Sequence, residues 1–308
     1  MSIITLTINP ALDKSAKING LVPEQKLRCF SINHQPGGGG VNISRVLKRL
    51  GTESNCMVAL GGETGNLFEN LLLKEGVKLT KLPIASSTRE NFSVVDTQTS
   101  LQYRFGMPSN KILSDELEAI KKILQKKVKN NDVLVLSGSL PELVSENFYS
   151  EIITLFEHTK VKIVLDTSGK PLEETLKDKA VFLVKPNQRE LAQLANKEFL
   201  STKEQEAFAM SMIESKKAEY IVVSLGARGA FMASKEGIIY QTTPSVKVNS
   251  TIGAGDSMVA GLLYALEHGF SNKHVLKYGV ACGVATTMSE GTNLASIENI
   301  EHALELIN

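Results

Sequence analysis

The most informative segment of the sequence reads Ser250-Thr251-Ile252-Gly253-Ala254-Gly255-Asp256-Ser257-Met258. A long apolar segment with helical spacing follows at once, over about residues 257–268. Because glycine has no Cβ, the backbone at Gly253 and Gly255 can turn tightly and approach a ligand. The unpaired N–H groups at the start of the helix would face that turn and form an anion hole. Asp256 is then placed to take a proton from a hydroxyl that attacks phosphorus, although an N-cap aspartate after a glycine turn is the plainer alternative.

The composition restricts the class of protein. Of 308 residues, 42% are hydrophobic and 22% charged, which is ordinary for a globular domain. A formal net charge of +1 without a basic stripe argues against a nucleic-acid partner, and three widely spaced cysteines predict neither disulfides nor a zinc site. No apolar run approaches the roughly 18 residues of a membrane span, and the first ten residues lack the basic start of a signal peptide. We therefore expect one cytoplasmic domain over residues 1–308, with no membrane partner.

Short apolar runs alternate with helical patterns along most of the chain. The runs that we expect as strands are Ile3–Ile8, Cys56–Leu60, Val133–Leu136, Lys162–Leu165, Val181–Val184 and Tyr220–Val223. This alternation predicts an α/β fold whose central sheet is mostly parallel and covered by helices on both faces. Polar or glycine residues end the later runs: Ser137–Ser139, Asp166–Ser168, Lys185–Asn187 and Ser224–Gly226. The carboxyl ends of parallel strands meet at one edge, so we expect these residues beside the 253–256 turn.

Two features near the start of the chain also indicate a ligand site. Asp13 lies just beyond the first run and is a candidate for binding substrate hydroxyls, with a surface-turn aspartate as the alternative. Four glycines, Gly37–Gly40, run directly into an amphipathic segment over residues 41–51. Consecutive glycines are costly in chain entropy, which favours a ligand-cradling turn over a flexible linker. Asn42, two residues after the glycines, would offer its amide to the ligand.

A predicted hairpin interrupts the α/β rhythm. Asn91–Val95 and Leu101–Phe105 are joined by a polar turn, and the second run alternates apolar and polar residues as a strand with one covered face does. With an irregular edge strand over Lys26–His34, it predicts a small β lid from about 14–35 and 88–106. Arg89 and Arg104 bracket the hairpin and are placed to reach a phosphate, although isolated arginines are more often solvated.

Together these motifs resemble the ribokinase-like sugar kinases, the PfkB family, along nearly the whole chain. The first signature is Gly37–Gly40 with Asn42, Arg45 and Leu50-Gly51; the second is Gly253–Asp256; between them stands Asn187-Gln188-Arg189-Glu190. Further segments resemble the branch of the minor bacterial 6-phosphofructokinases: Lys26–Cys29, Gln102–Phe105 and Ser137–Pro141. That branch has glycine, here Gly39, where 1-phosphofructokinases and tagatose-6-phosphate kinases usually have lysine. Glu142-Leu143 departs from the Pro-Gly of many relatives.

The resemblance implies phosphoryl transfer from ATP to the 1-hydroxyl of fructose 6-phosphate. It implies Asp256 as the base and the amides of Gly253, Ala254 and Gly255 as the anion hole. The residues implied to hold the sugar phosphate are Asp13, Lys26, Arg28, Gly38, Gly39, Asn42, Arg89, Arg104 and Ser139. Those implied to border the nucleotide are Lys185, Asn187, Ser224, Gly226 and Gly229. Glu190 and Asp166 would hold magnesium through water. A potassium site would include Ser250, Ile252, Thr286, Ser289, Gly291 and Asn293.

The resemblance also implies a homodimer, because relatives pair their lids and so cover exposed strand edges. Three alternatives to a 6-phosphofructokinase function stay open. A kinase of fructose 1-phosphate or tagatose 6-phosphate would share every catalytic group. A sensor on the same fold would bind a sugar phosphate without turnover, but Asp256, the glycine turn and Glu190 together speak against it. A Rossmann dehydrogenase would need a Gly-x-Gly-x-x-Gly turn after the first strand, and residues 3–13 contain none.

Overall fold

A nine-stranded sheet forms the centre of the structure, a computed structural model that describes residues 2–307. The strand order is β13-β12-β11-β10-β9-β8-β1-β4-β5. These strands are β1 (Ile3–Thr7), β4 (Ser54–Leu60), β5 (Lys78–Pro83), β8 (Val133–Ser137), β9 (Lys162–Asp166), β10 (Val181–Val184), β11 (Ala218–Ser224), β12 (Ala230–Ser234) and β13 (Gly237–Gln241). Every pairing from β5 to β11 is parallel, whereas β12 and β13 add antiparallel strands at one edge. The predicted α/β fold with a mostly parallel sheet is confirmed.

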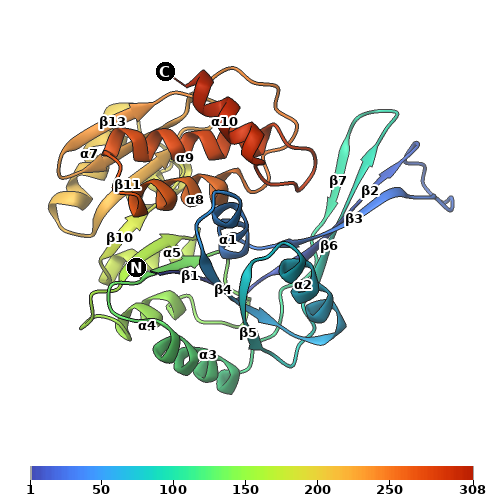
Figure 1. Cartoon of the computed structure of the whole chain (residues 1–308), viewed down its shortest axis with the longest axis horizontal. Helices are drawn as coiled ribbons and strands as arrows, with labels where there is room; N and C mark the ends of the chain where they lie inside the picture. The colour runs from blue at the N-terminus through green and yellow to red at the C-terminus, as the bar shows by residue number, and fades with distance from the viewer. Residues whose placement is uncertain (1, 308) are drawn as a thin grey trace.

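Helices cover both faces of this sheet (Figure 1). One layer, with its own apolar core, contains α3 (Ser114–Lys127), α4 (Phe148–Thr154), α5 (Lys170–Asp178), α6 (Gln188–Leu194) and α7 (Thr202–Glu214). The other contains α1 (Gly39–Arg49), α8 (Ala254–Glu267), α9 (Asn272–Thr287) and α10 (Ile297–Leu306), with α2 (Gly62–Lys74) in a smaller cluster over β4. Alternate residues of one strand therefore point into different cores: Ile3 of β1 belongs to the second layer and Leu6 to the first. None of the described helices is long and apolar enough to cross a membrane.

A second, four-stranded sheet projects from one side of this body (Figure 1). We call it the small sheet; its order is β3-β2-β6-β7, with β2 (Ala11–Ile18), β3 (Phe30–Gly37), β6 (Arg89–Asp96) and β7 (Gln102–Phe105). The predicted hairpin is its β6–β7 pair, in which Phe92 pairs with Phe105. The edge strand expected over 26–34 begins only at Phe30.

Four strands were not predicted from the sequence: β2, β5, β12 and β13. β2 carries Lys14, Ser15 and Lys17, so it has no continuous apolar run. It is held instead by the next strand, β3, and by β6, which lies far away in the chain. One consequence concerns Asp13, which lies inside β2 and not in a turn after the first strand.

Candidate active site

The glycine turn opens helix α8 as the sequence suggests. Gly253 is the N-cap residue, with a left-handed φ of 74° that glycine adopts without strain, and no side chain caps the helix. The Ala254 amide makes one long bond of 3.4 Å to the Thr251 carbonyl, and no described residue accepts a hydrogen bond from the Gly255 amide. The end of α8 therefore presents unpaired N–H groups and the positive end of the helix dipole, which together suit an anion.

Asp256 lies in the first turn of α8 and accepts a hydrogen bond of 2.8 Å from the Nδ2 of Asn42. This bond joins the two glycine-rich segments of the sequence, since Asn42 is in the first turn of α1, just after Gly40. Burial, together with the nearby negative charge of Asp166, raises the pKa of Asp256 to about 7, against the opposing effects of Asn42 and Lys185. A carboxylate whose pKa is near neutrality is suited to accept a proton in that pH range.

A lysine and an aspartate stand next to this turn. Lys185, at the end of β10, is 8% exposed, and its Nζ lies 3.3 Å from Oδ1 of Asp166, which ends β9. Burial alone lowers the pKa of Lys185, but the attraction of Asp166, Glu190 and Asp256 outweighs it, so the pKa lies above its ordinary value. A Cβ on Gly255 would stand only 3.3 Å from the Lys185 ammonium. The lysine thus brings a fixed positive charge to the anion-binding end of α8.

Asn187 and Glu190 make a capping box at the start of α6. The Asn187 side chain accepts from the Glu190 amide at 2.9 Å, and Glu190 Oε2 accepts from the Asn187 amide at 2.8 Å. This arrangement satisfies two N–H groups of the helix end and gives the Asn-x-x-Glu element a structural role. Burial raises the pKa of Glu190 above its ordinary value, although the Asn187 amide and Lys185 oppose the shift.

A cavity of about 410 Å³ lies between the small sheet and the glycine turn. Its lining includes Asp13, Arg89 and Arg104 from the small sheet, and Ile252 from the turn. Asn91 donates a 2.9 Å hydrogen bond to Asp13, and burial raises the pKa of that carboxyl despite Asn91 and the arginines. Two guanidinium groups and a carboxylate around one space match the chemistry of a phosphorylated polyol, whose phosphate takes arginine and whose hydroxyls take a carboxylate.

The guanidinium of Arg89 has only long internal hydrogen bonds. It donates at 3.3 Å to the carbonyl of Pro10 and at 3.4 Å to those of Asn9 and Met107. Ser139 lies nearby, because its Oγ accepts from Asn9 at 3.0 Å. Three weak bonds leave Arg89 able to exchange a partner for a phosphate oxygen.

The glycine loop packs closely on the end of the central sheet. A Cβ on Gly38 would meet Thr7, and one on Gly39 would stand 2.2 Å from the Oγ of Ser137 and 3.1 Å from the Gly138 amide. Gly38 also has a φ of 129°, which side chains rarely allow. Packing within the chain therefore already explains glycine at these positions.

Three residues predicted to border the nucleotide lie at the end of β11 or in the loop after it: Ser224, Gly226 and Gly229. Ser224 pairs with Asn187 in an isolated parallel bridge, which places the two predicted residues side by side. Gly226 has a φ of 63° and open space around it. A Cβ on Gly229 would stand 2.0 Å from the Gln241 carbonyl, so packing against β13 already explains that glycine.

The predicted potassium residues lie on two neighbouring loops, one before α8 and one after α9, except Thr286, which lies in the last turn of α9. Within residues 2–307, no hydrogen bond ends on the backbone carbonyls of Ser250, Ile252, Ser289, Gly291 or Asn293. Free carbonyl oxygens are suitable ligands for a hard cation. Thr286 differs: it is fully buried, its hydroxyl donates to Ser257 at 2.7 Å, and its carbonyl accepts from Ser289.

Two predicted substrate residues lie apart from the others. Lys26 and Arg28 are exposed in the segment between β2 and β3, and neither lines the 410 Å³ cavity. Conversely, Asn91 and Thr292 line that cavity and were not predicted. Their only signal was position, since Asn91 lies in the predicted hairpin and Thr292 beside the predicted potassium residues.

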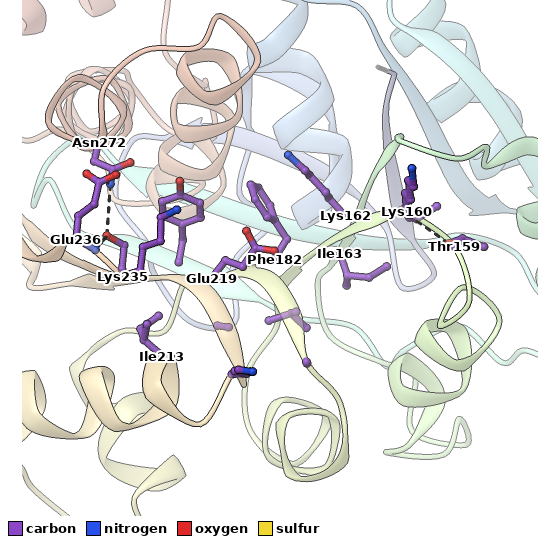
Figure 2. Close-up of a pocket in the computed structure, with 17 residues that line it drawn as sticks. Thr159, Lys160, Lys162, Ile163, Phe182, Ile213, Glu219, Lys235, Glu236 and Asn272 are labelled. Atoms are coloured by element: carbon purple, nitrogen blue, oxygen red, sulfur yellow. Dashed lines mark hydrogen bonds between the residues drawn. The ribbon is translucent and has the colours of Figure 1, made fainter.

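A larger cavity of about 670 Å³ lies at the opposite, amino-terminal edge of the central sheet. Figure 2 shows Lys160, Lys162 and Phe182 there, with Lys162 Nζ 4.5 Å from the centre of the Phe182 ring. None of the residues predicted for the site lines it. We therefore assign the chemistry to the smaller cavity, which adjoins the glycine turn. Within residues 2–307, no group of three or more His, Cys, Asp or Glu side chains is placed to hold a metal directly.

Comparisons with known proteins show which proteins this chain resembles. A family model described as "pfkB family carbohydrate kinase" matches residues 3–299. ATP-dependent 6-phosphofructokinase isozyme 2 of Mycobacterium tuberculosis is 36% identical over 304 residues, which are 99% of this chain and 89% of that protein. A 1-phosphofructokinase of Borreliella burgdorferi is 35% identical over 303 residues, covering 98% of this chain and 96% of its own.

Solved structures are equally similar. Phosphofructokinase-2 from Escherichia coli in complex with potassium superposes with a TM-score of 0.93 at 34% identity, covering 99% of this chain and 98% of that one. The same enzyme in complex with fructose 6-phosphate gives a TM-score of 0.91 at 33% identity, with the same coverage.

Proposed function

Because this chain belongs to the pfkB family of carbohydrate kinases, we propose that it phosphorylates fructose 6-phosphate at the 1-hydroxyl, giving fructose 1,6-bisphosphate. Membership of the family makes the chain an ATP-dependent sugar kinase. The observation that carries the choice of a phosphosugar is the cavity in which Asp13, Arg89 and Arg104 meet the turn that leads to Asp256.

Each residue of the proposed site has its own role in the reaction. Asp256 accepts the proton of the attacking hydroxyl, and Asn42 holds the carboxylate through the 2.8 Å bond. The amides at the start of α8, with the Lys185 ammonium beside Gly255, stabilise negative charge on the phosphoryl group in transfer. Asp13 orients sugar hydroxyls, and Arg89 and Arg104 bind the phosphate already on the sugar.

The choice among three phosphosugars rests on Gly39. A Cβ there would meet the Ser137 hydroxyl and the Gly138 amide, so the lysine usual in 1-phosphofructokinases and tagatose-6-phosphate kinases would require both groups to shift. This supports fructose 6-phosphate as the substrate. The 35% identity to a 1-phosphofructokinase keeps fructose 1-phosphate as the second candidate.

Magnesium and potassium enter as proposed cofactors. Asp166 and Glu190 flank Lys185 and are too few to enclose an ion, which fits magnesium that keeps most of its water ligands. Bound magnesium would neutralise charge on the ATP phosphates. For potassium, the free carbonyls of Ser250, Ile252, Ser289, Gly291 and Asn293 supply a suitable oxygen set. Thr286 is the weakest member of the proposed site, because its hydroxyl and its carbonyl both already have hydrogen-bond partners.

We also propose that the small sheet forms a homodimer interface and acts as a lid. β3 and β7 are its edge strands, and apolar side chains stand exposed on it or beside it: Phe30 at 45%, Ile32 at 57%, Phe105 at 48% and Met107 at 45%. Exposed edges with apolar side chains favour association with another chain.

A coupled assay tests the function. ATP turnover would be measured with fructose 6-phosphate, fructose 1-phosphate, tagatose 6-phosphate and unphosphorylated fructose at matched concentrations. We expect fructose 6-phosphate to give the highest kcat/KM and fructose almost no turnover. A higher kcat/KM for fructose 1-phosphate would transfer the assignment to the second candidate, and binding without turnover of any sugar would favour a sensor.

A further inference from the structure

One buried side chain joins the small sheet to a loop more than 250 residues away. Gln35 of β3 is 9% exposed, and both ends of its carboxamide are used. Its Nε2 donates to Oδ1 of Asn293, and its Oε1 accepts from the hydroxyl of Thr292 at 2.9 Å. Figure 1 shows the loop between α9 and α10, which carries both partners, on the side of the body that faces the small sheet.

This loop touches both halves of the proposed site. Thr292 lines the 410 Å³ cavity together with Asp13 and Arg89. Two residues on, the Leu294 side chain packs on the glycine turn, because a Cβ on Gly253 would stand 2.6 Å from its Cδ2. Displacement of the loop would therefore change the sugar-phosphate cavity and the anion-binding turn together.

The middle of the loop has few other restraints. Its one internal backbone bond joins the Asn293 amide to the Glu290 carbonyl at 3.1 Å. Beyond it, Arg49 of α1 donates at 2.8 Å to the carbonyls of Leu294 and Ala295 and so fixes the end of the loop. The two hydrogen bonds of Gln35 are thus the main restraint on the positions of Thr292 and Asn293. Gln35 also accepts the hydrogen bond that the Thr292 hydroxyl donates. The oxygen of that hydroxyl is therefore left to accept a hydrogen bond from a sugar hydroxyl.

We propose that Gln35 is a positioning residue that couples the sugar-phosphate cavity to the loop over residues 289–294. It holds Thr292 as a wall of the cavity and Asn293 in the loop that supplies the proposed cation carbonyls. Sugar-phosphate affinity and the response to potassium should therefore both depend on Gln35. This inference rests on the proposed function for its kinetic part, while the position of the loop can be measured without any substrate.

The first measurement is hydrogen–deuterium exchange on the full-length protein without ligand. Gln35→Ala should speed exchange of the Asn293 amide about fivefold or more, the effect of losing about 1 kcal/mol of restraint. Thr292→Val, which removes one bond, should speed it less, and Thr292→Ser, which keeps the hydroxyl, should resemble the parent. The matched control is Gln125→Ala, the same substitution at an exposed position on α3.

The second measurement is kinetic. Gln35→Ala should raise KM for fructose 6-phosphate about five- to tenfold while KM for ATP changes less than about twofold, and the ratio of rates in potassium and sodium should move toward one. In the double variant Gln35→Ala/Thr292→Val, the increase should be smaller than the product of the two single effects.

The outcomes separate this inference from the proposed function. Unchanged loop exchange in Gln35→Ala, or an equal rise of both KM values, would overturn the coupling. Failure of the parent to turn over any phosphosugar would remove the proposed function, and the exchange data would still decide whether Gln35 positions the loop. If Gln35→Ala does not fold, the difference between Thr292→Val and Thr292→Ser decides the same question.

Discussion

The Nδ2 of Asn42 lies 2.8 Å from a carboxylate oxygen of Asp256, across 214 residues of chain. The bond joins the start of α1, which follows the glycine loop, to the start of α8, which follows the glycine turn. The helix that begins at the glycine loop therefore orients the proposed base at the start of α8. This geometry makes Asp256 the first residue to test.

Asp256→Asn should leave the fold intact and lower kcat about 10²- to 10⁴-fold, as for loss of a general base. The amide keeps the shape of the carboxylate but cannot accept the proton. Steady-state rates with fructose 6-phosphate and ATP would measure this, with Asp178→Asn, exposed at the end of α5, as the control. A variant with more than about a tenth of parental kcat would remove Asp256 from this role.

The same variant should change stability in a pH-dependent way. The pKa of Asp256 is about 7 in the fold and about 4 in an unfolded chain, so its ionisation costs stability as pH rises through that window. Asp256→Asn should therefore match the parent Tm at about pH 4, exceed it increasingly up to about pH 7, and keep a constant advantage above that pH. Thermal unfolding followed by circular dichroism would test the trend. A Tm advantage that is constant with pH would show that ionisation is not its cause.

Arg89→Ala should raise KM for fructose 6-phosphate far more than KM for ATP. A charge-assisted hydrogen bond is worth about 1.5–3 kcal/mol, or roughly 10- to 150-fold in binding. Initial rates over a grid of both substrates would separate the two constants, and Lys122→Ala, an exposed cation on α3, serves as control. Equal increases in the two constants would mean that Arg89 does not read the sugar phosphate.

Replacing sodium by potassium at fixed ionic strength should raise activity if the free carbonyls on either side of α8 and α9 hold the ion. Potassium is larger and less strongly hydrated than sodium, so a loose ring of carbonyls suits it better. Initial rates in the two chloride salts measure the effect. Equal rates would argue against a functional cation site and leave the kinase assignment standing.

Ile32→Asp should convert the proposed homodimer to a monomer, because it places a charge on the exposed edge strand β3. Light scattering after size-exclusion chromatography would give the mass of each species. Phe199→Asp, at a position that is 75% exposed on the main body, is the control. A parent protein that is monomeric at micromolar concentration would contradict the dimer directly.

The sequence predicted the parts of the fold that carry a local signal. Val133–Ser137 and Val181–Val184 are almost wholly buried apolar runs, and their pattern identifies them whatever they pair with. β2 is different: its polar residues tolerate partial exposure, and only pairing with β3 and with distant β6 makes it a strand. Its existence could not be read from its own composition.

The candidate site divides in the same way. Gly253–Asp256 forms a helix start from neighbouring residues, so its geometry was predictable. The contacts of Asn42 with Asp256 and of Gln35 with Thr292 depend on how α1 and β3 pack on the C-terminal part of the chain, and no spacing encodes that. Lys26 and Arg28 are the opposite case. Their sequence motif is present, but their side chains do not line the 410 Å³ cavity of their own chain.

The joints between the two sheets also matter mechanically. β1 ends at Thr7 and β2 begins at Ala11, while β3 passes into α1 through Gly38 alone. Spans this short hold the base of the small sheet close to the central sheet and to α1. Asp13 and Gly37 lie close to these spans. The end of the small sheet that carries Asp13 is therefore the part most restrained relative to the body of the protein, and the opposite end is the least restrained.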